Sequence, residues 1–167
     1  MMEEWGNFFV AMAGASVAFA GLVLVSVSIN LKQILKQPGL ISRAGKPLVV
    51  LFTLFVASSI MLIPDQRRSF YGIELMLLAL AFAVAISAVL RNQHRRAQTA
   101  PPPRAMPRYS LQFRVALFSL IAIGIFTGGL VVALGDERGI FFLVPAAIIG
   151  FMLAFIEAWV LLIEIDR

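Results

Sequence analysis

The chain has 167 residues, of which 60% are hydrophobic and 14% are charged, and its mean hydropathy is +0.93. A soluble globular domain is about 45–50% apolar and about 25% charged. The composition of this chain therefore excludes a soluble globular domain. The absence of cysteine excludes disulfide frameworks, thiolate metal centres and cysteine nucleophiles. The length corresponds to one domain. Together these features predict an integral membrane protein.

Five apolar stretches predict five transmembrane helices, which would form one all-α transmembrane domain over residues 1–167. A helix needs about 17–25 apolar residues to cross a hydrocarbon core about 30 Å thick. In the second and shortest stretch, Pro47 is expected in the first helical turn, where proline is tolerated. In the fifth, Pro145 is expected either to mark the first turn or to kink the helix. The expected spans are residues 6–31, 47–63, 71–90, 111–134 and 140–163.

The positions of the basic residues predict the orientation. Five spans place the two termini on opposite sides of the membrane. Only Arg67, Arg68 and Arg138 then share the side of the N-terminus. The opposite side holds the other eleven: Lys32, Lys36, Arg43, Lys46, Arg91, Arg95, Arg96, Arg104, Arg108, Arg114 and Arg167. Because Lys and Arg are retained on the cytoplasmic side, we expect the N-terminus outside and the C-terminus in the cytoplasm.

The first apolar stretch is expected to be a retained helix. A cleaved signal peptide has a positively charged segment before its apolar region, whereas this chain begins Met1-Met2-Glu3-Glu4.

Two basic cytoplasmic loops are expected, over residues 32–46 and 91–110. The net charge of +5 is concentrated there, next to the spans, which favours contact with anionic lipid headgroups over nucleic acid. The residues expected at the headgroups are Lys32, Lys36, Arg91, Arg95 and Arg96. The second loop contains a proline-rich segment, residues 100–107, that is expected to act as a tether.

Small residues at every fourth position predict close helix packing, because helices in lipid approach tightly only where side chains are small. The fourth span carries Gly124 and Gly128. The fifth carries the series Ala146, Gly150, Ala154 and Ala158. In the first span, Ala11 and Ala15 share one face, and Gly14 and Ala18 share another. Either these faces pack within one chain, or one of them, with Gly124 and Gly128 the first choice, remains available for self-association.

Glu157 is the clearest charged residue within a span, where an ionised group costs roughly 2.5–3.5 kcal/mol at the helix centre. We expect it to lie in a buried polar cluster. Arg114, which enters the fourth span from the same side, is the favoured partner, and Asn30 and Ser87 are the others. Three interpretations remain open: a structural ion pair, a carboxylate linked to a proton or ligand, and an interfacial residue that reaches water.

The first span also carries Ser16, Ser26 and Asn30, which could line a pore in an oligomer. Serines in membrane helices also bond their own backbone, which is the simpler interpretation. No paired intramembrane aspartates, zinc-binding His–Glu spacing, nucleophile elbow or phosphate-binding loop occurs in the sequence. The sequence therefore predicts neither catalytic residues nor a metal or cofactor site.

Residues 55–90 align with residues 126–161 at an offset of 71, with Asp65 against Asp136 and Arg67 against Arg138. This alignment raises the alternative that the chain contains a duplicated helical hairpin preceded by one extra helix.

The first span contains Trp5-Gly6-Asn7-Phe8-Phe9, Ala13-Gly14-Ala15-Ser16, Gly21-Leu22 and Ser28-Ile29-Asn30-Leu31. These segments resemble the first helix of a group of small bacterial multi-spanning membrane proteins, some of which are named modulators of FtsH protease. The resemblance is best over the first 40 residues. It implies a bacterial plasma-membrane protein and supplies no catalytic residues.

The leading hypothesis for function is a non-enzymatic membrane protein that acts by helix association, either as a homo-oligomer or as an accessory or regulatory subunit. The first alternative is an oligomeric channel lined by the first span. The second is a bundle that binds a lipid or another hydrophobic ligand.

Overall fold

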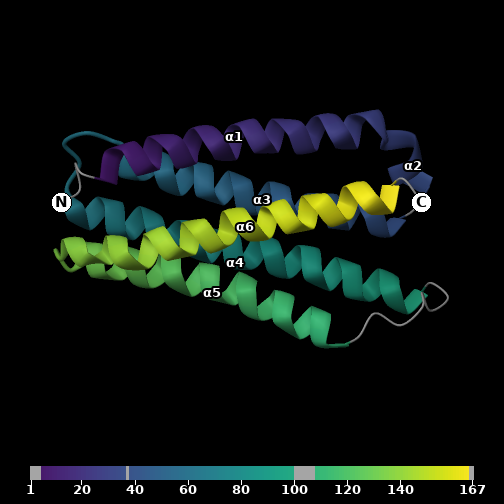
Figure 1. The fold of residues 1–167 in the computed structure, drawn as a ribbon. Coiled ribbons are helices and arrows are strands. Elements are labelled where there is room, and N and C mark those ends of the chain that lie inside the picture. The colour runs from purple at the N-terminus through teal and green to yellow at the C-terminus, as the bar shows by residue number, and fades with distance from the viewer. Residues whose placement is uncertain (1–4, 37, 100–107, 166–167) are drawn as a thin grey trace.

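The computed structural model describes residues 5–36, 38–99 and 108–165, and these residues form helices and tight turns without a strand. The elements in chain order are α1 Gly6–Ile29, α2 Leu31–Lys36, α3 Pro38–Met61, α4 Arg68–Thr99, α5 Arg108–Ala133, η2 Glu137–Gly139 and α6 Ile140–Ile165. The long helices lie side by side in one bundle (Figure 1). The expected all-α architecture is therefore confirmed.

Four of these helices are long and apolar enough to cross a membrane: Gly6–Ile29, Arg68–Asn92, Gln112–Ala133 and Glu137–Val160. This finding supports the prediction of a membrane protein. The apolar part of α3 is shorter and comprises Gly45–Met61.

The prediction of a loop over residues 32–46 is wrong, because most of this segment is helical. α2 ends at Lys36 and α3 begins at Pro38, nine residues before Pro47. Pro38 occupies a first helical position, where its missing N–H has no intrahelical partner to lose. Pro47 is buried inside α3 rather than in its first turn. Apolarity marks where a helix can enter lipid, whereas hydrogen bonding of the backbone decides where the helix begins.

The loop expected over residues 91–110 is also shorter than predicted. α4 continues to Thr99 and α5 begins at Arg108, so only residues 100–107 remain between them, and these lie outside the described residues. Pro145 is the sixth residue of α6 and lies within the helix, beyond its first turn.

α3, α4, α5 and α6 form the inner bundle. α3 packs against α4 and α6, and α5 also packs against α4 and α6. Each helix of one hairpin thus contacts one helix of the other, an arrangement that a duplicated hairpin would also adopt. The shared core contains Leu51, Leu54, Leu75, Phe82, Phe118 and Ile121.

Glycines allow the inner helices to meet at very short distances. A Cβ placed on Gly72 of α4 would lie 2.4 Å from the carbonyl oxygen of Gly129 in α5. Only a residue without a side chain permits this approach. The turn after α5 depends on Gly135, whose φ is +93°. Its N–H donates to the carbonyl of Val132, and the N–H of Asp136 donates to that of Val131, which closes α5 with a Schellman motif.

α1 lies outside the inner bundle, against α3 and, less extensively, α6 (Figure 1). Aromatic contacts attach it to α6 at two levels. Trp5 meets Phe141 edge-on with ring centres 6.4 Å apart, and Phe19 stacks on Phe155 at 5.6 Å. The short helix α2 follows α1 at the end of the bundle opposite the N-terminus (Figure 1).

Candidate functional site

A buried ionic cluster joins three helices at the end of the bundle away from the N-terminus. Glu157 of α6 has a side chain that is 5% exposed. Its Oε1 lies 3.3 Å from Nη1 of Arg114 in α5, and its Oε2 lies 3.6 Å from Nζ of Lys46 in α3. Lys46 is 3% exposed, whereas Arg114 is 27% exposed. The cluster therefore holds one carboxylate between two cations.

All three charges lie close to one end of an apolar segment. Lys46 is the second residue of Gly45–Met61, Arg114 the third of Gln112–Ala133, and Glu157 the fourth from the end of Glu137–Val160. Because a charge becomes less costly towards the membrane surface, this depth suits an ion pair better than the bilayer centre does. The arrangement ties α3, α5 and α6 together at one level.

Lys46 is the member of the cluster that sequence reasoning missed. The pattern placed it at the end of a cytoplasmic loop, and the structure places it in α3 with its side chain against Glu157. A signal was present in the sequence, because Lys46 directly precedes the apolar run that begins at Pro47. The burial of the Lys46 side chain depends on α3 beginning at Pro38, which the sequence pattern did not predict.

The other two residues expected near Glu157 bond to their own helices. The side-chain amide of Asn30 donates to the carbonyl of Ser26 at 3.0 Å. The hydroxyl of Ser87 donates to the carbonyl of Ala83. The contacts found for the Glu157 carboxylate come instead from Arg114 and Lys46.

The residues expected to line a pore do not form one open polar face. Ser16 is fully buried, so it cannot line a pore on the outer side of α1. Ser26 is half-buried and its hydroxyl donates to the carbonyl of Leu22, four residues earlier. Asn30 in turn bonds to the Ser26 carbonyl. These local bonds follow the simpler interpretation of hydroxyls in membrane helices.

The small residues that the sequence pattern singled out in α5 and α6 pack inside the chain. A Cβ on Gly124 would lie 2.7 Å from Cβ of Ala146, and one on Gly128 would lie 2.6 Å from Cγ of Leu143. Gly150 faces Leu54 of α3. Ala154 and Ala158 are also buried in the core. The interpretation that Gly124 and Gly128 remain free for a second copy is therefore wrong, because α6 covers them.

α1 has small residues that remain open. A Cβ added to Gly14 or Gly21 would have nothing within 4 Å. Exposed small side chains lie at alternating intervals of three and four residues along one side of the helix: Ala11, Gly14, Ala18 and Gly21. We call these four residues the outer face of α1. Residues at these intervals form one continuous stripe on a helix.

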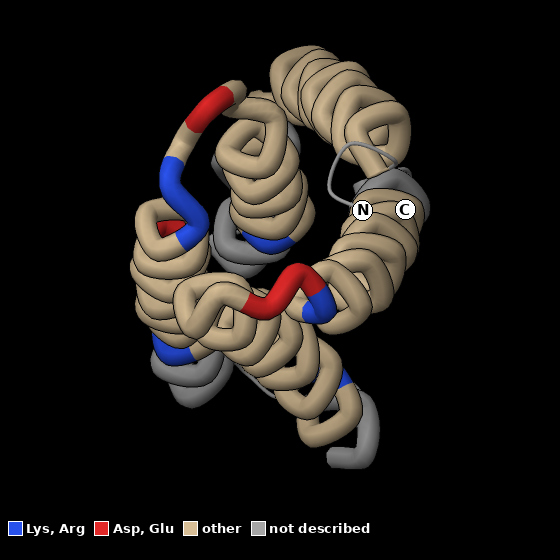
Figure 2. The backbone as a smooth tube through the Cα atoms, turned by 90° about the vertical axis from the view of Figure 1, so that its left-hand side faces the viewer, with Lys and Arg blue, Asp and Glu red and all other residues tan. Residues whose placement is uncertain are grey.

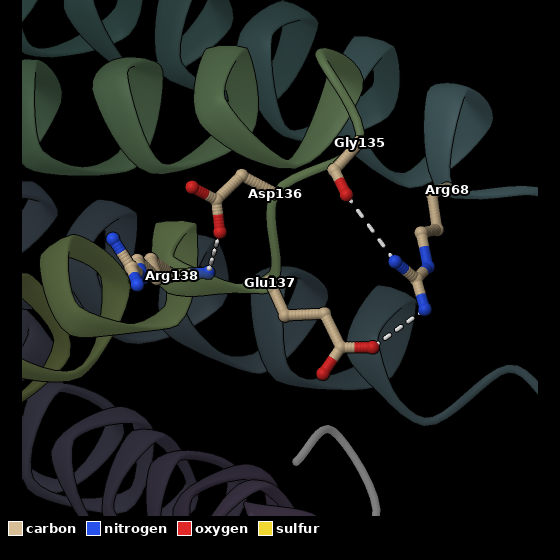
Figure 3. Close-up of polar contacts among 5 residues, drawn as sticks. All are labelled: Arg68, Gly135, Asp136, Glu137 and Arg138. Atoms are coloured by element: carbon tan, nitrogen blue, oxygen red, sulfur yellow. Dashed lines mark hydrogen bonds and ion pairs between the residues drawn. The ribbon is translucent and has the colours of Figure 1, made fainter.

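At the opposite end of the bundle, a second polar contact joins the first residue of α4 to the segment between α5 and α6. Arg68 donates from Nη2 to Oε1 of Glu137 at 2.5 Å and from Nη1 to the carbonyl of Gly135 at 3.2 Å (Figure 3). Asp136 caps η2 by accepting from the N–H of Arg138 at 2.9 Å. Figure 2 shows the charges in these turns at the near end of the bundle. Arg68 is half exposed, so this contact belongs to the surface.

Of the residues expected at lipid headgroups, Lys32 and Arg91 are exposed. Lys36, Arg95 and Arg96 belong to helices, and their side chains lie outside the described residues.

Comparison with known proteins gives no match, whether with family models, curated proteins or solved structures. The class of the protein therefore follows from its own fold: a helical bundle with four helices able to cross a membrane and a buried ionic cluster near one end.

Proposed function

We propose that this chain is a non-enzymatic protein of the bacterial plasma membrane that acts by helix association through the outer face of α1. It contacts either a second copy or a transmembrane helix of another membrane complex, which it would accompany as an accessory or regulatory subunit. The observation that carries this proposal is the open space around Gly14 and Gly21, while Gly124 and Gly128 of α5 and Gly150 of α6 are covered.

The physical basis is the weak attraction between apolar surfaces in lipid. Lipid tails are as apolar as leucine, so helices associate through close van der Waals packing at small residues. The outer face of α1 presents four such residues over about 15 Å at 1.5 Å per residue. The resemblance of the first helix to modulators of a membrane protease fits an accessory role.

The proposal includes five membrane crossings with the N-terminus outside and the C-terminus in the cytoplasm. In addition to the four longer helices, α3 also crosses the membrane. Its apolar part has 17 residues and measures about 25 Å, and a bilayer thins locally around a short helix. Lys46, Arg114 and Glu157 then lie at the cytoplasmic interface. There the exposed Lys32 and Arg91 contact anionic headgroups.

Cross-linking in the membrane tests the association. The chain has no cysteine, so a single introduced cysteine reacts alone. We expect Gly14→Cys to give a disulfide-linked product on mild oxidation. The matched control is Leu77→Cys at a similar depth on α4, where the side chain is 61% exposed. A product of twice the chain mass identifies a second copy, and another mass identifies a partner subunit.

A second variant separates association from chance collision. Gly14→Leu adds bulk in open space, so it should leave the fold intact and convert the native complex to a monomer in native mass spectrometry. The proposal is overturned if the wild-type chain is a monomer without bound protein and Gly14→Cys forms no more cross-link than Leu77→Cys.

Labelling of intact cells tests the orientation. A membrane-impermeant maleimide should label Asp65→Cys in intact cells and Arg91→Cys only after lysis. The reverse pattern would overturn the proposed orientation.

A further inference from the structure

Ser16 of α1 differs from six other hydroxyl residues of the described helices. Each of those six donates to a carbonyl four residues earlier in its own helix. The residues that do so are Ser26, Ser28, Thr53, Ser59, Ser87 and Thr127. Ser16 is fully buried, yet its Oγ has no hydrogen-bond partner among the described residues. A buried polar group without a partner costs about 1–3 kcal/mol, so Ser16 calls for an explanation.

Ser16 lies on the wall of a groove between α1, α3 and α4. The groove has a volume of about 810 Å³ and opens to the side of the bundle. Its walls include Ala20 and Gly21 of α1 and Ala81 and Ala85 of α4, and Phe52 of α3 lies between them. The side chain of Phe52 is 66% exposed, so its ring is accessible from the groove.

The groove has the size and composition of a ligand site. Pockets for small molecules measure about 300–1,000 Å³ and are mainly apolar, with a few polar groups that orient the ligand. Here the polar side chains are those of Ser16 and Thr53, and none of the described residues that line the groove is charged. Ser16 is the eleventh residue of the 24 in α1, and Thr53 is the ninth of the 17 in Gly45–Met61. The groove thus lies near the middle of the membrane-spanning segments.

We propose that this groove binds a neutral, flat lipophilic molecule whose ring carries a carbonyl oxygen, the chemistry of a membrane quinone. The ring packs against Phe52, and the carbonyl accepts a hydrogen bond from the hydroxyl of Ser16. Small shifts of side chains in the groove wall bring the hydroxyl to the ligand, as is common on binding.

The features of the groove favour this ligand over other occupants. A plain acyl chain has no acceptor for Ser16, and a charged ligand would lie unpaired at this depth. The groove extends along α1 from Ser16 to Leu24, about 12 Å at 1.5 Å per residue. A spanning helix is about 30 Å long, so it would meet the groove over less than half its length.

Binding of a probe to the purified full-length protein in nanodiscs tests the proposal. The probe is a benzoquinone with a decyl tail, and the matched control ligand is decylbenzene, which has the same tail without carbonyl groups. Native mass spectrometry should show one quinone per chain, with decylbenzene bound at least tenfold more weakly.

Two variants locate the site. Ser16→Ala should weaken quinone binding about tenfold, whereas Ser28→Ala, which removes a self-bonded hydroxyl from the same helix, should leave it unchanged. Ala81→Phe should fill the groove from α4 and abolish binding, with circular dichroism confirming that each variant is folded.

The outcomes are distinct from those of the association experiment. Gly21 belongs to both the outer face of α1 and the groove, so the variant that separates them is at Gly14, which does not line the groove. Gly14→Leu should retain quinone binding, and Ala81→Phe should retain association. Equal binding of decylbenzene and quinone, unaffected by Ser16→Ala, would show an acyl-chain site and overturn the proposal. Absence of quinone binding, or a Leu78→Cys cross-link between two copies in the groove, would overturn it as well.

Discussion

α6 and α1 have similar length and composition, yet they have opposite roles in the bundle. In each helix, the segment apolar enough to cross a membrane contains 24 residues and has small side chains at intervals of three or four. In α6, 44% of the most apolar window is buried, against 17% in α1. The small residues of α6 lie against α3 and α5, whereas Ala11, Gly14, Ala18 and Gly21 of α1 remain exposed. A small-residue motif therefore indicates that close packing is available, and the neighbours decide whether it is already used.

The largest effect is expected from the buried charge of α6. Glu157→Ala should lower the free energy of unfolding by about 3–5 kcal/mol, because it leaves Lys46 and Arg114 facing each other without the carboxylate between them. Denaturation by SDS in mixed micelles, followed by circular dichroism, would measure the change. The control Lys32→Gln alters an exposed charge and should change stability by less than about 0.5 kcal/mol.

A double variant makes this test sharper. Replacing Lys46 by Met together with Glu157 by Leu should recover much of the stability lost in Glu157→Ala. The charge that then remains in the cluster is that of Arg114, whose side chain is 27% exposed and can reach water. If Glu157→Ala costs less than about 1 kcal/mol, the cluster does not hold the three helices together as described.

The same substitution in the two helices should give different results. Gly150→Leu in α6 should destabilise the fold by about 1–3 kcal/mol, because a Cβ there already lies 3.3 Å from Cδ2 of Leu54. Gly14→Leu in α1 enters open space and should cost less than about 0.5 kcal/mol. Both variants would be compared by the same SDS denaturation. Equal losses would contradict the distinction between a covered and an open face.

The smallest effect is expected at the contact between α4 and η2, at the end of the bundle opposite the buried cluster. Arg68→Gln removes the contact with Glu137 and should cost about 0.2–1 kcal/mol, because the pair lies at the surface. The difference from wild type should shrink as salt is raised from low to high concentration, whereas the effect of Glu157→Ala should persist. Denaturation series at two salt concentrations would check this. A salt-independent loss above about 2 kcal/mol would show that the contact is more buried than the structure indicates.

Local patterns predicted the helical membrane class, the approximate spans and the pairing of Arg114 with Glu157. These features depend on composition, on the length of apolar runs and on the depth of a charge within one helix, all of which are visible in the sequence. The boundaries were less accurate, because helix continues through polar residues such as those of α4 between Arg91 and Thr99.

Tertiary structure decided which faces meet. The burial of Lys46, the covering of Gly124 and Gly128, the openness of Gly14 and the unpartnered hydroxyl of Ser16 all depend on how each helix is rotated against its neighbours. In a chain this apolar, nearly every helix face is compatible with lipid, so hydrophobicity carries little information about rotation. The sequence by itself determined that the chain forms helices long and apolar enough to cross a membrane, whereas close packing and the pairing of buried charges determined which helices lie inside and which face remains open.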